Sequence, residues 1–181
     1  LMVGILRTVK GHDTALQAFR ILSSKFPDAS LVLAGDGPLL PAMEQLAHTL
    51  GIAKRVHFLG FRNDVPDLMG AADVLLLTSR SEGVPQTVTQ ALGLGLPVVA
   101  TSVGGVSELV QNEQSGLLVP PNDPNATADA VRRIIGDPGM AERFRGAGRA
   151  HVRQNFSLQA MLDKTEHVCL ELLTAKRQAS L

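Results

Sequence analysis

The chain has 181 residues, of which 45% are hydrophobic and 19% charged, proportions typical of one globular domain with a sizeable core. Its 17 basic residues balance its 17 acidic ones, so no overall charge draws it to nucleic acid, and an anionic ligand must be held by a local site. The single cysteine, Cys169, excludes an internal disulfide framework and a thiolate zinc site, and we expect a cytoplasmic protein.

The chain opens directly on LMVGIL, which already has the pattern of a strand. The first residues lack the basic-then-apolar order of a secretory signal, and no apolar run approaches the length needed to span a bilayer. Leu1 is not a natural start, so we interpret the sequence as a fragment whose upstream domain is missing. A tag residue on a complete small protein is the alternative interpretation.

Six apolar runs predict β-strands that are buried on both faces, because most of them lack the polar alternation of a sheet with one wet face. In chain order they are MVGIL, LVLAG, VHFLG, DVLLLTS, PVVAT and GLLV. Segments with helical spacing of apolar residues lie between them, so the order of elements predicts an α/β fold with a doubly wound parallel sheet. We expect a single domain over residues 1-181, with an α/β core at 1-136 and C-terminal helices at 137-181.

Strand patterns stop near Asp137, and residues 138–154 predict one polar helix. Ser157 is a suitable N-cap for a last helix. One apolar stripe follows that helix, for which core packing is the simplest interpretation and docking against a missing domain the second. Its residues are Leu158, Met161, Leu162, Val168, Cys169, Leu172 and Leu173.

Ligands of open parallel sheets bind where the strands end and helices begin, which directs attention to the loops. The loop after the first strand places Arg7, Lys10 and Gly11 before a helix, a combination that suits a phosphate group. Taken alone, this loop favours the plainer alternative, a solvated loop with Asp13 capping the helix. His12 is interpreted as a local hydrogen-bonding residue rather than a base.

The stretch SEGVPQTVTQALG after the fourth strand carries more information. Pro85 suits the first turn of a helix whose free N–H groups, at Gln86 and Thr87, would face the crevice and bind a diphosphate without a metal. Glu82 could accept hydrogen bonds from sugar hydroxyls, and Gln90 lies on the same side of the helix as Gln86. The alternative, in which Glu82 caps the helix and Gln90 is a surface residue, is equally supported by these residues alone.

Two more loops could contribute to a site. The paired glycines of TSVGG permit the close approach of a ligand or of backbone, and a plain tight turn is the alternative. The loop after VHFL, residues 60–64, could hold a nucleobase through backbone groups, and helix capping by Asn63 or Asp64 is the competing use. The sequence has no Walker loop, GxGxxG, nucleophile elbow, close His-His-carboxylate set or Asp-x-Asp, so we expect no metal and no cofactor.

The combined pattern resembles the C-terminal, donor-binding half of retaining GT-B glycosyltransferases, specifically glycosyltransferase family 4, the glycosyl transferases group 1. The resemblance runs in order over nearly the whole chain. Its parts are VGIL-RTVKGHD, LVLAGDGP, VHFLGF, ADVLLLTSRSEGVPQ, GLPVVATSVGGVSELV, SGLLVPPND and FSLQAMLDKTEHVCLELL. It implies a Rossmann-like domain that binds a nucleotide-sugar, while a separate N-terminal domain binds the acceptor.

The resemblance also implies roles for individual residues. Lys10 would contact the donor phosphates and Glu82 the donor sugar, which makes these two the expected catalytic residues. The diphosphate would meet the backbone after Gly83, and the expected donor-binding residues are Arg7, Gly60, Phe61, Arg62, Gly83, Val84, Pro85, Gln86 and Gln90. Glu108 matches a recurrent glutamate that orders the loop and the helix start.

The chain departs from the family pattern at two positions. Ile5 stands where the family often has an arginine, and Arg7 is the expected replacement from a nearby position. Gln90 stands where the family has a second glutamate, eight residues after Glu82. An amide oxygen can still accept a hydrogen bond from ribose hydroxyls, although more weakly than a carboxylate.

The resemblance implies metal-independent sugar transfer, with retention, from a nucleoside-diphosphate sugar to a hydroxyl of a glycan, lipid or small molecule. The full enzyme could associate peripherally with a membrane, and this chain alone should bind donor weakly and transfer nothing. The alternatives are a nucleotide-sugar epimerase or phosphorylase of the same fold, and a non-catalytic nucleotide-binding module.

Overall fold

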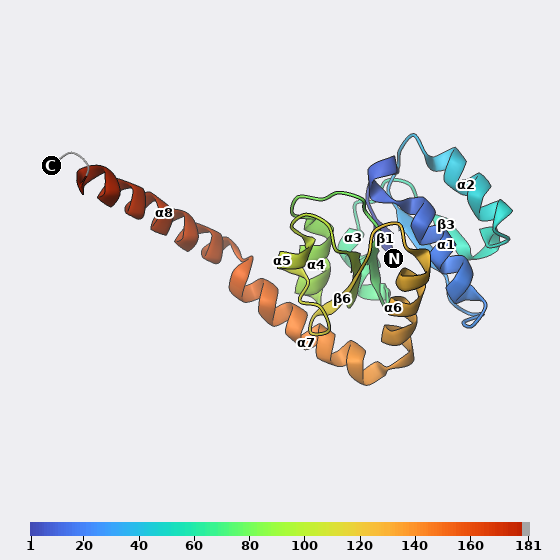
Figure 1. Cartoon of the computed structure of the whole chain (residues 1–181). Helices are drawn as coiled ribbons and strands as arrows, with labels where there is room; N and C mark the ends of the chain where they lie inside the picture. Colours follow the sequence, from blue (N-terminus) through green and yellow to red (C-terminus); the bar gives the residue numbers. More distant parts are fainter. Residues whose placement is uncertain (179–181) are drawn as a thin grey trace.

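The computed structural model describes residues 1–178, in which parallel strands alternate with helices (Figure 1). The strands are β1 Met2–Val3, β2 Leu31–Ala34, β3 Val56–Phe58, β4 Leu75–Leu77, β5 Val98–Thr101 and β6 Gly116–Val119. The α-helices are α1 His12–Ser23, α2 Leu40–Thr49, α3 Val65–Ala71, α4 Gln86–Leu94, α5 Val106–Leu109, α6 Pro124–Gly136, α7 Pro138–Asn155 and α8 Leu158–Gln178. Short 3-10 turns, η1 Thr8–Lys10 and η2 Ala53–Arg55, precede α1 and β3.

The strands form two parallel three-stranded sheets, ordered β1-β2-β3 and β4-β5-β6. Backbone hydrogen bonds at Leu1 join them, because its nitrogen donates to the Val74 carbonyl at 2.9 Å and its carbonyl accepts from the Leu76 N–H at 2.8 Å. The combined order is therefore β3-β2-β1-β4-β5-β6, and the direction of winding reverses between β1 and β4. This arrangement confirms the doubly wound, Rossmann-like parallel sheet expected from the sequence.

Helices cover both faces of the sheet, so the strands are buried on two sides. Alternate residues of β4 show this, because Leu76 packs in one apolar cluster while Leu75 and Leu77 pack in the other. The first cluster also takes residues of α1, α2, α6 and the start of α7, and the second takes residues of α3, α4 and α5. Apolar runs without alternation are the sequence signature of such two-sided burial.

The first strand is shorter than the run MVGIL predicts. Regular pairing ends at Val3, yet the N–H groups of Gly4 and Leu6 still donate to the carbonyls of Ala34 and Asp36, both at 2.9 Å. The chain therefore stays beside the end of β2 as an irregular segment, and this segment leads into the loop that carries Lys10.

The polar helix α7 starts at Pro138 as predicted and ends at Asn155. Asp137 caps it by accepting from the Met140 N–H at 2.9 Å, and Ser157 caps α8 by accepting from the Ala160 N–H at 3.2 Å. The prediction that the last helix begins after a Ser157 cap is therefore confirmed.

The expectation that the apolar stripe of α8 packs in the core is wrong. Figure 1 shows α8 projecting away from the sheet, and the stripe residues are exposed, from 50% at Leu162 to 69% at Leu158. The helical spacing of apolar residues predicted one continuous apolar face, but it does not specify what covers that face. None of the helices described for this chain is both long and apolar enough to cross a membrane.

Candidate functional site

The loops after β1 and β4 meet at the carboxyl edge of the sheet, where the winding reverses. There the Lys10 ammonium donates to Glu82 Oε1 at 2.7 Å, although the two residues are 72 positions apart. The side chains retain 24% and 10% of their exposure, so the pair is mostly enclosed but reachable from solvent. A doubly wound sheet binds ligands at this reversal point, because the loops of neighbouring strands diverge there and leave a crevice.

Glu82 is held by a second contact, in which the Ser79 hydroxyl donates to the same Oε1 at 2.6 Å. Ser79 is itself buried, and its carbonyl accepts from Thr101 Oγ1 at 2.6 Å. The carboxylate therefore has a fixed orientation, with Oε2 left to accept from a ligand. Ser79 was not among the site residues expected from the sequence.

The alternative in which Glu82 caps helix α4 is not observed. The N-cap residue of α4 is Pro85, one position before the first helical turn in which it was expected, and no side chain caps this end. Within residues 1–178 the N–H groups of Gln86 and Thr87 donate to no protein acceptor. The uncapped start of α4 thus presents free donors and partial positive charge beside Glu82.

The paired glycines after β5 support the loop that carries Glu82. A Cβ on Gly104, whose φ is +50°, would lie 1.9 Å from the Glu82 carbonyl oxygen, and one on Gly105 would lie 2.5 Å from that of Gly83. The N–H of Gly105 also donates to the Gly83 carbonyl at 3.1 Å. The sequence permitted the close approach of a ligand or of backbone at these glycines, and the structure shows backbone there.

The Lys10 loop, residues 7–11, is tightened by η1 and ends at Gly11 with a φ of +65°. A Cβ on Gly11 would lie 2.1 Å from the Thr78 carbonyl oxygen, and Thr78 Oγ1 donates to the Gly11 carbonyl at 2.8 Å. The glycine therefore allows close packing of the β1 loop against β4. Arg7, the other cation expected here, is exposed.

One alternative for this loop is wrong, and within the described residues the hydrogen bonding expected of His12 is not observed at Nδ1. Asp13 does not cap α1, because Gly11 is the N-cap residue and the Asp13 carboxylate pairs with Arg80 at 2.7 Å. His12 is not a local hydrogen-bonding residue through Nδ1, because that atom is buried without a partner in the described part of the chain. The side chain is only 2% exposed, and burial lowers the pKa of His12 to about 4.

The loop after β3 lies at the same edge of the sheet but two strands away from β1. Phe61 is 77% exposed, and a Cβ added to Gly60, whose φ is +65°, would have nothing within 4 Å. Arg62 donates to Asp64 Oδ1 at 2.8 Å, and this contact raises the pKa of Arg62 and lowers that of Asp64. Asp64 is the N-cap residue of α3 but makes no side-chain cap bond, so helix capping does not explain it.

Gln86 and Gln90 are both exposed on α4, as expected for residues four positions apart on one helix. Gly83 and Val84 are also exposed, between Glu82 and the helix start. Within residues 1–178 no group of three or more His, Cys, Asp or Glu side chains is close enough together to hold a metal ion.

A cavity of about 930 Å³ lies at the opposite edge of the sheet, where the strands begin. Its lining is largely apolar and includes Phe26, Leu68 and Ile135. Neither Lys10 nor Glu82 lines it. Convergent polar groups distinguish a binding site from a plain hollow, so we place the candidate site at the carboxyl edge instead.

A family model described as glycosyl transferases group 1 matches residues 1–151. Among curated relatives, the alpha-D-kanosaminyltransferase of Streptomyces kanamyceticus is 30% identical over 174 residues. The match covers 95% of this chain and 45% of that enzyme, so the chain spans about half the length of the relative.

Two solved structures share the fold. The C-terminal domain of a glycosyl transferase group 1 family protein from Francisella tularensis matches with a TM-score of 0.79 and 25% identity, over 87% of this chain and 86% of that one. HepE from Anabaena, solved in complex with UDP, matches with a TM-score of 0.81 and 28% identity, over 99% of this chain and 49% of that one. The similarity thus includes the C-terminal helices as well as the sheet.

Proposed function

Because the chain belongs to the glycosyl transferases group 1 family, we propose that it is the donor-binding half of a glycosyltransferase. The donor, a nucleoside-diphosphate sugar, would lie in the crevice between the ends of β1 and β4. The observation that carries this proposal is the contact between Lys10 and Glu82 beside the uncapped start of α4. A cation, free N–H groups and a fixed carboxylate lie together there.

Positive charge for the diphosphate comes from two sources in this chain. The Lys10 ammonium has three N–H donors and gives one to Glu82, so the others remain for phosphate oxygens. The free N–H groups at the start of α4 add partial positive charge. These donors would stabilise the leaving diphosphate as the bond to the sugar breaks, with Arg7 as a further cation and without a metal ion.

Glu82 would hold the sugar rather than attack it. Its Oε1 is occupied by Lys10 and Ser79, which leaves Oε2 to accept hydrogen bonds from sugar hydroxyls. We propose a transfer with retention, in which the acceptor hydroxyl attacks the sugar from the same face from which the diphosphate leaves. This route requires no protein nucleophile. The nucleobase would lie toward Gly60, Phe61 and Arg62, with the ribose near Gln90.

The acceptor would be a hydroxyl of a glycan, a lipid or a small molecule, bound by a further domain. The exposed stripe of α8 is the surface on which we propose that this domain docks, since the chain spans only 45% of its kanosaminyltransferase relative. We propose a cytoplasmic location for the full enzyme, with peripheral membrane association where the acceptor is a lipid.

Calorimetric titration of the chain with UDP, GDP and ADP tests the donor site. We expect one of them to bind and Lys10→Ala to weaken it by about 10- to 100-fold, the loss expected for a hydrogen bond between charged groups. Lys54→Ala, which removes an exposed lysine before β3, is the matched control and should leave binding unchanged. Failure of all three nucleotides to bind, or binding indifferent to Lys10, would refute the proposal.

A further inference from the structure

We propose that Arg80 is a positioning residue that fastens the Lys10 loop to the loop carrying Glu82. The inference rests on the proposed function, since it concerns how the cation of the same site is placed. Arg80 was not among the expected site residues. It lies two positions before Glu82, in the loop after β4, and its side chain is 30% exposed.

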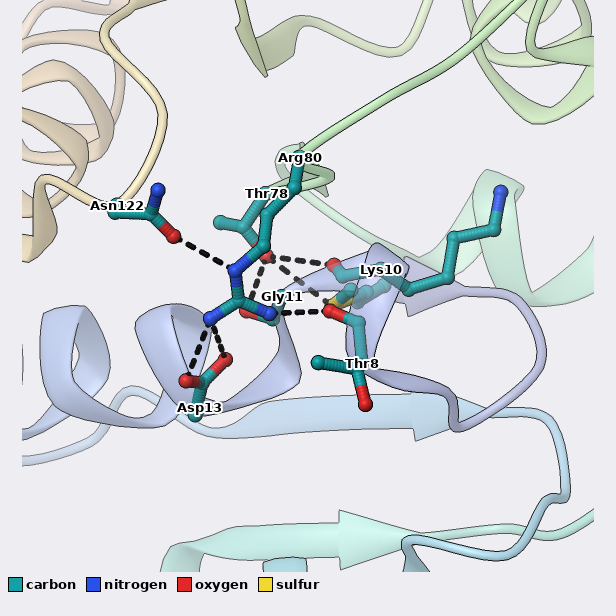
Figure 2. A network of polar contacts seen from close by, with 8 residues as sticks. Thr8, Lys10, Gly11, Asp13, Thr78, Arg80 and Asn122 are labelled. Atoms are coloured by element: carbon teal, nitrogen blue, oxygen red, sulfur yellow. Dashed lines mark hydrogen bonds and ion pairs between the residues drawn. The ribbon is translucent and has the colours of Figure 1, made fainter.

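The guanidinium of Arg80 joins three loops (Figure 2). Nη2 donates to both oxygens of Asp13, at 3.0 and 2.7 Å, and Nη1 donates to the Thr8 carbonyl. Nε donates to Asn122 Oδ1 at 2.8 Å, in the turn between β6 and α6. The rigid planar fork of arginine permits three directions of contact at once, which a lysine could not reproduce.

These contacts flank Lys10 on both sides along the chain. Thr8 precedes it and Asp13 follows it, and the Arg80 N–H additionally donates to the Val9 carbonyl at 2.7 Å. Because Arg80 and Glu82 belong to one short loop, fastening the Lys10 loop to Arg80 also fixes the backbone of Lys10 relative to the Glu82 carboxylate. The 2.7 Å contact between the two side chains depends on that placement.

Arg80 acts through the backbone rather than on the ligand. Figure 2 shows the Lys10 side chain extending away from the guanidinium, toward the other side of the loop. Each of the three guanidinium nitrogens already donates to Thr8, Asp13 or Asn122, and we assign the phosphate contact to Lys10. Asn122 itself has a φ of +59°, a conformation that asparagine tolerates better than most residues.

Variants of Arg80 and of its anionic partner Asp13 separate positioning from direct binding. The probes are the tightest binder among UDP, GDP and ADP, and its phosphate-free nucleoside. We expect Arg80→Ala to weaken binding of the nucleoside diphosphate about tenfold and to change the affinity for the nucleoside by less than about twofold. Arg80→Lys keeps the positive charge but not the planar guanidinium. Its affinity for the nucleoside diphosphate should fall nearly as far as that of Arg80→Ala. In a Lys10→Ala background the effect of Arg80→Ala should disappear.

Asp13→Asn is the decisive variant because it keeps the Arg80 cation while it removes the negative charge of the partner and one of the partner's two acceptor oxygens. Positioning predicts weaker diphosphate binding, whereas a direct phosphate contact by Arg80 predicts unchanged or stronger binding, which would overturn the inference. Equal losses for the diphosphate and its nucleoside in Arg80→Ala would also overturn it, since they would indicate general damage to the site. Arg133→Ala, which removes a comparable two-pronged ion pair with Glu113, is the control and should change neither affinity.

Amide hydrogen exchange measures how well the Lys10 loop is ordered when no ligand is bound. The N–H of Lys10 donates to the Arg7 carbonyl at 3.0 Å and that of Gly11 to the Thr8 carbonyl at 3.2 Å. Both should exchange about tenfold faster in Arg80→Ala and in Asp13→Asn. Unchanged exchange would overturn the positioning role even if a nucleotide binds. If the wild-type chain binds no nucleotide, the proposed function fails, and exchange alone decides whether Arg80 orders the Lys10 loop.

Discussion

The Lys10 ammonium and the Glu82 carboxylate lie 2.7 Å apart, so the cation and the anion of the candidate site are partly neutralised by each other. Glu82→Gln should therefore leave Lys10 freer to meet a phosphate. We expect the variant to bind a plain nucleoside diphosphate as well as the wild type or about two- to fivefold more tightly, a modest gain because the pair is partly solvated. Its affinity for the corresponding nucleotide-sugar should fall relative to the nucleotide.

Calorimetry with the nucleoside diphosphate that binds, and with a nucleotide-sugar of the same base, measures both effects. Glu113→Gln serves as the control, because it removes a carboxylate that is also in an ion pair, with Arg133, but lies after α5. A loss of affinity for the nucleoside diphosphate in Glu82→Gln would contradict the proposed division of roles between Lys10 and Glu82.

A side chain at position 11 should destabilise the fold far more than a side chain at Gly51, a glycine of similar conformation. A Cβ at Gly11 would lie 2.1 Å from the Thr78 carbonyl oxygen, whereas Gly51, at a φ of +70°, has nothing within 4 Å. We expect Gly11→Ala to lower the free energy of unfolding by roughly 3 kcal/mol and Gly51→Ala by about 1 kcal/mol, the cost of the left-handed backbone alone. Urea denaturation measures both, and equal losses would show that the contact with Thr78 is unimportant.

Burial of His12 should make the chain less stable in mild acid. Because burial lowers its pKa from 6.5 to about 4, the unfolded imidazole binds a proton between these pH values and the folded one does not. The contribution of neutral His12 to the free energy of unfolding is therefore fully present above about pH 6.5. As the pH falls toward 4, the free energy of unfolding decreases by at most about 1.4 kcal/mol per pH unit.

Urea denaturation at pH 7 and pH 5 tests the contribution of His12. His12→Met places an apolar side chain at the same position. Between these two pH values its free energy of unfolding should decrease by about 2 kcal/mol less than that of the wild type. His57→Gln, which removes an exposed histidine of β3, controls for the loss of an imidazole. An identical decrease in His12→Met and the wild type would exclude His12 as the source.

Gln90 offers a test of how the ribose is held. Gln90→Glu places a carboxylate eight residues after Glu82, and a charged acceptor hydrogen-bonds a hydroxyl more strongly than an amide does. We expect about threefold tighter binding of the nucleoside and about threefold weaker binding in Gln90→Ala. The nucleoside is used because it carries no phosphate that the new charge could repel. Gln154→Glu on α7 is the control, and indifference of the nucleoside to both Gln90 variants would place the ribose elsewhere.

The sequence was sufficient to locate both charged residues of the candidate site. Lys10 and Glu82 each follow a strand that is buried on both faces, and such strands end at a common edge of a parallel sheet. Their direct contact was not predicted, because it depends on the packing of Gly11 against Thr78 across 67 positions. Spacing along the chain carries no signal for a contact of that range.

Arg80 was missed because its partner has an equally reasonable local role. An aspartate in the first turn of a helix predicts interaction with the helix start, and only the fold shows that Asp13 instead faces the guanidinium. The apolar stripe of α8 was misplaced for a related reason, because periodicity identifies an apolar face without its partner. In both cases the missing information is which distant segment comes near.

The most direct test of the donor site is an amide ¹H–¹⁵N NMR titration of the chain with the nucleoside diphosphate that binds. We expect the largest shifts at Lys10 and at Gln86 and Thr87, whose N–H groups donate to no acceptor within residues 1–178. Lys10→Ala should reduce these shifts at equal ligand concentration. Shifts confined to the cavity at the other edge of the sheet, around Leu68 and Ile135, would contradict the donor site proposed here.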